Sequence, residues 1–154
     1  MKIIVLNGAK HTKKDVLAMR LASKSGVVFV KPYTDKKIPI NCEPSEADDF
    51  IHLNETQLSR KIDNEIPLVI SYINNSRYVI FENQLKADCV VLILDDAGVF
   101  NLKQNWGGEI ITVKLHSKNE KPSNRNLMTD DEFDYVFDVD SDDFDKIVGE
   151  LWQK

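Results

Sequence analysis

The first twenty residues of the chain constrain its fold more than any other stretch. Lys2 to Leu6 is a short apolar run, residues 8–13 are polar, and the residues from Asp15 onward have the periodicity of a helix. A strand, a loop and a helix in this order are typical of proteins that hold phosphate on the loop. The sequence therefore predicts a strand–loop–helix unit whose loop and helix N-terminus face an anion.

The loop keeps half of the phosphate-binding motif G-x-x-x-x-G-K-[ST]. Gly8 and Lys14 stand at its first glycine and its lysine. Lys13 replaces the second glycine, and Asp15 replaces the hydroxyl residue. A lysine reaches the positive φ of such a loop only with strain, while a carboxylate still ligates Mg²⁺ but adds negative charge beside the phosphates. Two alternatives stay open: an anion-binding loop, and an ordinary turn in which Thr12 caps the helix.

Apolar runs alternate with amphipathic segments along the rest of the chain. Runs of branched and aromatic residues predict strands, and apolar residues three or four apart predict helices. Asn74 and Asn75 tolerate positive φ, which favours a hairpin turn at this point, and Ser141 is expected to cap the last helix. Strands are expected at 2–6, 27–31, 67–73, 77–81, 90–96, 109–115 and 135–139, and helices at about 14–24, 54–63, 99–104 and 142–152.

Apolar strands interleaved with helices predict an α/β fold: an open, mostly parallel five-stranded sheet with helices on both faces and a small β-hairpin insertion. The 154 residues predict a single domain, 1–154, with an insertion at about 32–86 and a reduced lid at about 116–130. Ligands of such sheets bind at the carboxyl ends of the strands. We therefore expect residues 8–14 to lie close to Asp95 and Asp96. The alternative is that the strand expected at 90–96, which ends in these two aspartates, simply ends in solvent.

Charge and cysteine content exclude several classes of protein. The net charge of −5 argues against a general nucleic-acid-binding surface, and no apolar run is long enough to predict a membrane span. Cys42 and Cys89 are isolated, which predicts reduced thiols in a cytoplasmic protein. Nine of the sixteen residues from 130 to 145 are acidic, which fits either a solvated face or a surface for a basic protein partner.

Five stretches taken together resemble the guanylate kinase family over the whole chain: residues 3–21, 48–65, 77–85, 87–98 and 131–151. The resemblance implies a shortened guanylate kinase-like P-loop fold, with ATP and Mg²⁺ as cofactors if the protein is active and none otherwise, and a nucleotide as ligand. It implies three catalytic residues, Lys14, Asp95 and Arg125. It implies a nucleotide site made of Gly8, Lys10, Lys13, Lys14, Asp15, Lys36, Lys37 and Tyr78, and a metal site made of Asp15 and Asp96.

The departures from the family fall on the residues that grip phosphate. Asp35 and Ile38 stand where the resemblance places two arginines, and neither adjacent lysine has the bidentate fork of arginine. Phe50 replaces a phosphate-binding tyrosine, and Arg125 is the single arginine between residues 116 and 130. One such arginine is worth ~10³–10⁵ in rate. The sequence thus predicts a degenerate relative that acts as a binding or interaction module for an unidentified protein partner; the alternative is a divergent nucleoside or deoxynucleoside monophosphate kinase that uses ATP.

Overall fold

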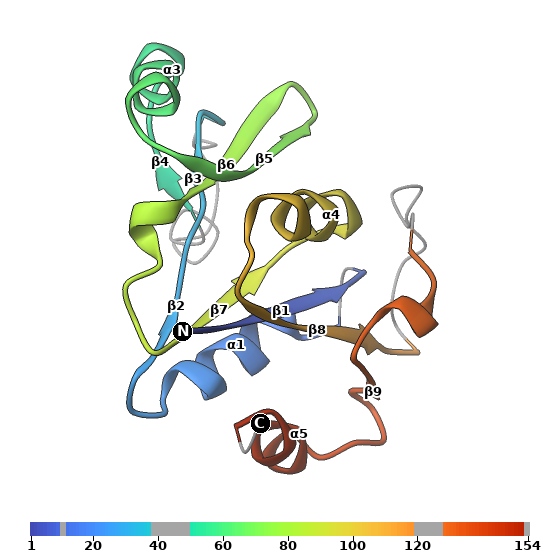
Figure 1. The fold of residues 1–154 in the computed structure, drawn as a ribbon. Helices are drawn as coiled ribbons and strands as arrows, with labels where there is room; N and C mark the ends of the chain where they lie inside the picture. Colours follow the sequence, from blue (N-terminus) through green and yellow to red (C-terminus); the bar gives the residue numbers. More distant parts are fainter. Residues whose placement is uncertain (10–11, 38–49, 119–127, 153–154) are drawn as a thin grey trace.

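The main sheet of the molecule has five strands, all paired in parallel, in the order β2-β7-β1-β8-β9 (Figure 1). The computed structural model describes residues 1–9, 12–37, 50–118 and 128–152. The strands are β1 (Lys2–Gly8), β2 (Val27–Phe29), β7 (Cys89–Ile93), β8 (Glu109–His116) and β9 (Tyr135–Asp138). The predicted five-stranded parallel sheet is thus confirmed.

Helices cover both faces of this sheet, because the central strand β1 carries apolar side chains on both of its faces. Ile4 and Leu6 of β1 belong to the core that includes α1 (Lys14–Ala22) and α5 (Phe144–Trp152). Ile3 and Val5 belong to the core on the other face, which α4 (Asp96–Asn105) covers (Figure 1). None of the helices in the described residues is long and apolar enough to cross a membrane.

A second, smaller sheet is made by four strands that lie between residues 33–34 and 76–81 in sequence, and it is mixed, with the order β4-β3-β6-β5. The predicted hairpin forms its larger half, with φ of 51° at Asn74 and 66° at Asn75 in the turn. The two-residue strands β3 and β4 were not predicted, since so short a strand has no periodicity to detect. The elements are β3 (Tyr33–Thr34), β4 (Ile51–His52), α3 (Glu55–Asn64), β5 (Pro67–Ile73) and β6 (Ser76–Phe81).

Two asparagines of α4 attach the second sheet to the first. The side-chain carbonyl of Asn101 accepts the backbone N–H of Ile70 at 3.0 Å, and the amide of Asn105 donates to the carbonyl of Leu68 at 2.9 Å. Residues four apart on a helix share a face, as do residues two apart on a strand. The free edge of β5 is therefore satisfied by α4, and the hairpin is held beside the carboxyl end of β7.

The last helix begins two residues later than predicted. Asp143 precedes Phe144, the first helical residue, and its carboxylate accepts the backbone N–H of Asp145 at 3.0 Å. The prediction that Ser141 caps this helix was therefore wrong, because three acidic residues follow Ser141 within four positions and the carboxylate of Asp143, two positions later, does the capping. Two short 3₁₀ helices, Glu82–Gln84 and Asp130–Glu132, complete the described elements.

Candidate anion-binding loop at the carboxyl edge of the main sheet

The connection from β1 to α1 turns through a left-handed residue. Lys13, the residue before the first helical position, has φ 59° and ψ 34°. The second glycine of the phosphate-binding motif would stand at this position. The positive φ expected of that glycine is present here, but a lysine adopts it. Thr12 does not cap α1: its hydroxyl donates to the carbonyl of Ala9 at 2.8 Å, so the expectation of a Thr12 cap was wrong.

Gly8 is required by close backbone packing. A Cβ atom at this position would lie 2.7 Å from the hydroxyl oxygen of Thr12 and 2.8 Å from the backbone carbonyl of Leu115. The carbonyl of Leu115 belongs to β8, whose position is fixed by its pairing with β1 and β9. The loop therefore lies against β8 only because residue 8 has no side chain.

The ammonium of Lys14 is folded back over the loop. Its Nζ donates to the carbonyl of Gly8 at 2.5 Å and to that of Ala9 at 3.4 Å. Burial and, next, the ammonium of Lys114 lower the pKa of Lys14 below that of an ordinary lysine, while the carboxylates of Asp15 and Asp95 oppose this shift. A positive charge that is partly desolvated and near a second cation gains stability when an anion approaches.

Replacing Lys13 with glycine is expected to stabilise the protein by about 0.5–1 kcal/mol. The left-handed conformation costs a residue with a Cβ about 1–2 kcal/mol, and the greater freedom of an unfolded glycine removes part of this gain. Chemical denaturation measures the change. Lys24→Gly, just beyond the same helix, is the control and should not stabilise; a Lys13→Gly variant no more stable than the parent would show that the turn is unstrained.

Beneath the loop lies a buried polar network of three side chains. The amide of Asn7 donates to Oδ1 of Asp96 at 2.9 Å and to the carbonyl of Leu94, while its oxygen accepts from Nζ of Lys114 at 3.0 Å. Lys114 is 5% exposed and lies over the ring of Phe133. Asn7 thus connects a buried ammonium to a buried carboxylate, which satisfies charges that the interior would otherwise disfavour.

Sequence reasoning missed Asn7, which directly follows the strand expected at 2–6, and Lys114, which lies inside the strand expected at 109–115. They are the only polar interruptions near the carboxyl ends of IIVLNG and IITVKL. A lysine in a strand predicted to be covered on both faces needs a buried acceptor. That requirement was the available signal.

The two aspartates after β7 have different surroundings. Asp95 caps α4, since its Oδ1 accepts the backbone N–H of Gly98 at 2.8 Å. Asp96 is 3% exposed, and its second oxygen accepts the backbone N–H of Met128 at 2.8 Å. Both lie next to the loop, as expected for the carboxyl edge, but Asp96 is bonded to protein donors on both oxygens. The described residues contain no group of three or more His, Cys, Asp or Glu side chains placed to hold a metal.

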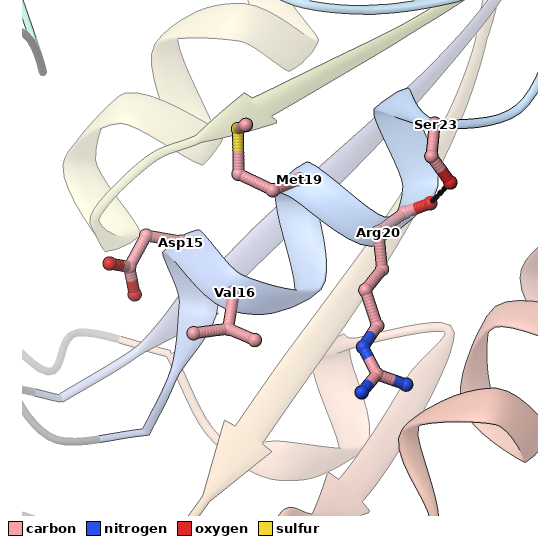
Figure 2. A pocket seen from close by; sticks show the side chains of 5 residues that line it. All are labelled: Asp15, Val16, Met19, Arg20 and Ser23. Carbon is pink, nitrogen blue, oxygen red and sulfur yellow. Dashed lines mark hydrogen bonds between the residues drawn. The ribbon is translucent and has the colours of Figure 1, made fainter.

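Other predicted site residues lie away from this network. Asp15 projects from the first turn of α1 into a shallow groove on its exposed side, together with Val16, Met19 and Arg20 (Figure 2). Lys36 and Lys37 line a groove at the N-terminus of α3. Lys10, His11, Cys42 and Arg125 lie outside the described residues.

Asp35, which stands where the resemblance places an arginine, is paired inside the protein. Its carboxylate accepts the guanidinium Nε of Arg77 at 2.8 Å and the backbone N–H of the same residue at 2.8 Å. Burial by itself raises the pKa of Asp35, but these hydrogen bonds and the charge of Arg77 hold it below its ordinary value. This position therefore carries an acid that the fold neutralises, rather than a cation that faces a ligand.

A cavity of about 240 Å³ separates the hairpin from the end of β7. Tyr78 lines it, with its ring in edge contact with Phe50 at 5.0 Å between ring centres. No lysine or arginine of the described chain is among the residues that line it. Its lining is Pro32, Phe50, Val69, Ser71, Ile73, Tyr78, Ile80, Ile93, Leu94 and Asp95.

Comparison with known proteins shows the fold. No protein-family model matches the sequence, and no curated protein matches it. Among solved structures, the chain is similar to the crystal structure of guanylate kinase from Anaplasma phagocytophilum, with a TM-score of 0.67 and 14% identity over 98% of this chain and 82% of that one. At this identity the likeness establishes a guanylate kinase-like α/β fold, here with an additional small mixed sheet.

Proposed function

We propose that this protein binds the phosphate groups of a nucleotide on the loop between β1 and α1, and that it does so as a binding module without efficient phosphoryl transfer. The observation that carries the proposal is the left-handed turn at Lys13, which brings the ammonium of Lys14 onto the carbonyls of Gly8 and Ala9. The guanylate kinase-like fold supports a scaffold of the nucleotide-kinase kind.

The N-terminus of α1 supplies the other half of the proposed site. No side chain caps it, so the first backbone N–H groups of the helix keep their capacity to donate to an anion. Lys14 adds a directed positive charge, and Lys13 and Lys10 are proposed to add to the local potential. Asp15 reduces this potential, which favours a moderate rather than a tight affinity.

The carboxylates predicted to hold Mg²⁺ do not fit a metal held by the protein. Asp96 is buried and bonded to Asn7 and Met128, whereas Asp15 is exposed on the outer side of α1. We therefore assign Asp96 a structural role. In this proposal Mg²⁺ accompanies the polyphosphate, which Mg²⁺ commonly binds while keeping several waters.

Efficient phosphoryl transfer is disfavoured by the residues near the 240 Å³ cavity, where a phosphate acceptor would bind if the protein were a kinase. Transfer depends on cations placed around the moving phosphate. Asp35 is neutralised by Arg77, the lining of the 240 Å³ cavity has no lysine or arginine among the described residues, and Lys36 and Lys37 line a different groove. These observations support a binding role over turnover.

A monophosphate kinase is the second candidate, and one observation favours it. Tyr78 and Asp95 line the same cavity, and the carboxylate of Asp95 also interacts with the ammonium of Lys14. An acceptor in the cavity would therefore lie near the phosphates on the loop. In this candidate Lys14, Asp95 and Arg125 are the proposed catalytic residues, and ATP and Mg²⁺ are the cofactors.

Calorimetric titration with ATP, GTP and inorganic triphosphate, each with and without Mg²⁺, tests the proposed function. The parent is expected to bind at least one of these polyanions, and Lys14→Met is expected to weaken binding by about tenfold or more, since a charge-assisted hydrogen bond contributes about 1.5–3 kcal/mol. Lys24→Met, an exposed lysine near the end of the same helix, is the matched control. Absence of binding by the parent, or equal affinity of the Lys14→Met variant, would contradict the proposal.

Two further measurements are informative: the pH dependence of binding tests the role of Lys14, and an assay of turnover separates the two candidates. Because the pKa of Lys14 is already lowered and an anion raises it, affinity should be lost as the pH rises, at a lower pH than for a site built on exposed lysines. A coupled assay of ADP formation with ATP and each common nucleoside monophosphate should show no turnover above background. Turnover at rates of about 1–100 s⁻¹, usual for kinases, would favour the second candidate.

A further inference from the structure

The cavity beside β7 has walls unlike those expected for a phosphate. Its sides come from the hairpin of the second sheet and from the last residues of the β7 segment, and most of them are aliphatic. The rings of Phe50 and Tyr78, at an interplanar angle of 61°, form its aromatic part. A surface of this kind favours a flat apolar body through burial and ring contact.

The polar groups of the cavity are few and carry one charge. Ser71 and Tyr78 each bring a hydroxyl, and Asp95 brings a carboxylate at the end next to the main sheet. Oδ1 of Asp95 is fixed by the N–H of Gly98, and no other hydrogen bond to this carboxylate occurs among the described residues. The cavity thus combines an apolar lining, two aromatic rings and an anchored anion. No described cation is in its lining, although the ammonium of Lys14, outside it, also interacts with Asp95.

We propose that this cavity binds a protonated amine carried on a flat apolar body of about one ring. The ammonium pairs with Asp95 and lies within reach of the aromatic rings, which attract cations through their faces. The volume of about 240 Å³ is below the range of about 300–1,000 Å³ usual for drug-sized ligands, so a single ring with a short arm is the fitting size. This inference does not rest on phosphate binding at the loop, which takes the opposite charge.

Three probes of one shape and different charge test this inference: benzylamine, benzyl alcohol and benzyl phosphate, each titrated into the full-length protein and followed by NMR. Benzylamine is expected to bind saturably and about tenfold more tightly than benzyl alcohol, because one charge-assisted hydrogen bond is added. Benzyl phosphate is expected to show no saturable shift of the residues that line the cavity, whether or not it binds at the loop. Asp95→Asn, which keeps a helix-capping side chain, should bring benzylamine down to the affinity of benzyl alcohol.

Two tryptophan variants locate the site, and one lysine variant separates it from the loop. Ile73→Trp, at a residue that lines the cavity, should fill part of it and abolish binding of both neutral and cationic probes, whereas Tyr72→Trp, at an exposed neighbouring position on the same strand, should leave both unchanged. Lys14→Met removes an ammonium that interacts with Asp95, so benzylamine binding should be kept or become tighter. The inference is overturned if benzylamine does not saturate, if it binds no better than the alcohol, or if Asp95→Asn or Ile73→Trp leaves its affinity unchanged. It is also overturned if benzyl phosphate, followed by the shifts of the residues that line the cavity, binds more tightly than benzylamine does in the Lys14→Met variant, in which the loop is weakened.

Discussion

Replacement of Arg77 by alanine is expected to lower the free energy of unfolding by about 3 kcal/mol, the lower end of the cost of breaking a buried ion pair. The guanidinium joins its own strand β6 to the residue after β3 and to α3, since it donates to Asp35, to the hydroxyl of Ser59 and to the carbonyl of Glu55. The side chain of Asp35 is 7% exposed, so its charge would be left without a partner. A thermal midpoint lower by about 6–12 °C is expected for a chain of this length.

An exposed pair in the same protein provides the control for Arg77. Arg20 contacts Asp145 at the same 2.8 Å, but their side chains are 48% and 84% exposed. Arg20→Ala is therefore expected to cost less than about 1 kcal/mol. Equal effects of Arg77→Ala and Arg20→Ala on urea denaturation would show that the inner pair contributes no more than a surface contact.

The inner pair also has a pH signature. Because the pKa of Asp35 is lowered in the folded protein, its contribution to stability is fully present above the ordinary aspartate pKa and is lost as the pH falls through the lower folded value. Asp35→Asn should therefore be less stable than the parent at neutral pH, and the difference should narrow below about pH 4. A difference that stays constant through this range would contradict the assignment.

The second large effect is expected at Asp96. Asp96→Ala should destabilise the fold by about 3 kcal/mol, because it removes the acceptor of Asn7 and of Met128 N–H and leaves the ammonium of Lys114 buried without its amide-bridged counter-charge. Chemical denaturation of the protein without added ligand or metal measures this effect. Its magnitude separates a structural carboxylate from one kept for metal binding.

The neighbouring aspartate is the matched control. Asp95→Ala removes a helix cap and is expected to cost about 1 kcal/mol. If Asp96→Ala costs no more than Asp95→Ala, and instead weakens a Mg²⁺-dependent interaction, Asp96 is a metal ligand and its assignment as a structural group is wrong.

Most elements of this fold could be predicted because each of them is encoded locally; the two-residue strands β3 and β4 could not. Alternating apolar faces set the strands of the main sheet, and Asn74-Asn75 set the turn of the hairpin through their tolerance of positive φ. The strand–loop–helix at the N-terminus indicated where a left-handed residue would be needed, and Lys13 adopts that conformation. Where several polar residues competed for one local role, as around Thr12 and Ser141, the sequence did not identify which of them is used.

The candidate site depended on pairings across long distances in the chain. The partners of Asn7 are 87, 89 and 107 residues away in sequence, and Arg77 reaches Asp35 across 42 residues. No local pattern reports such contacts. Only the assembled sheets decide that Asp96 is buried while Asp15 is exposed. They also decide that Tyr78 lines an apolar cavity while Lys36 and Lys37 line another groove.

The sequence by itself determined the order of strands and helices, the hairpin and the loop that faces the carboxyl edge, because backbone preferences and the side on which apolar residues fall are properties of neighbours along the chain. The tertiary structure alone decided which charges are neutralised internally and which remain for a ligand. The physical reason is that the energy of a charge depends on its burial and on the groups brought next to it, and both are set only when distant segments come together.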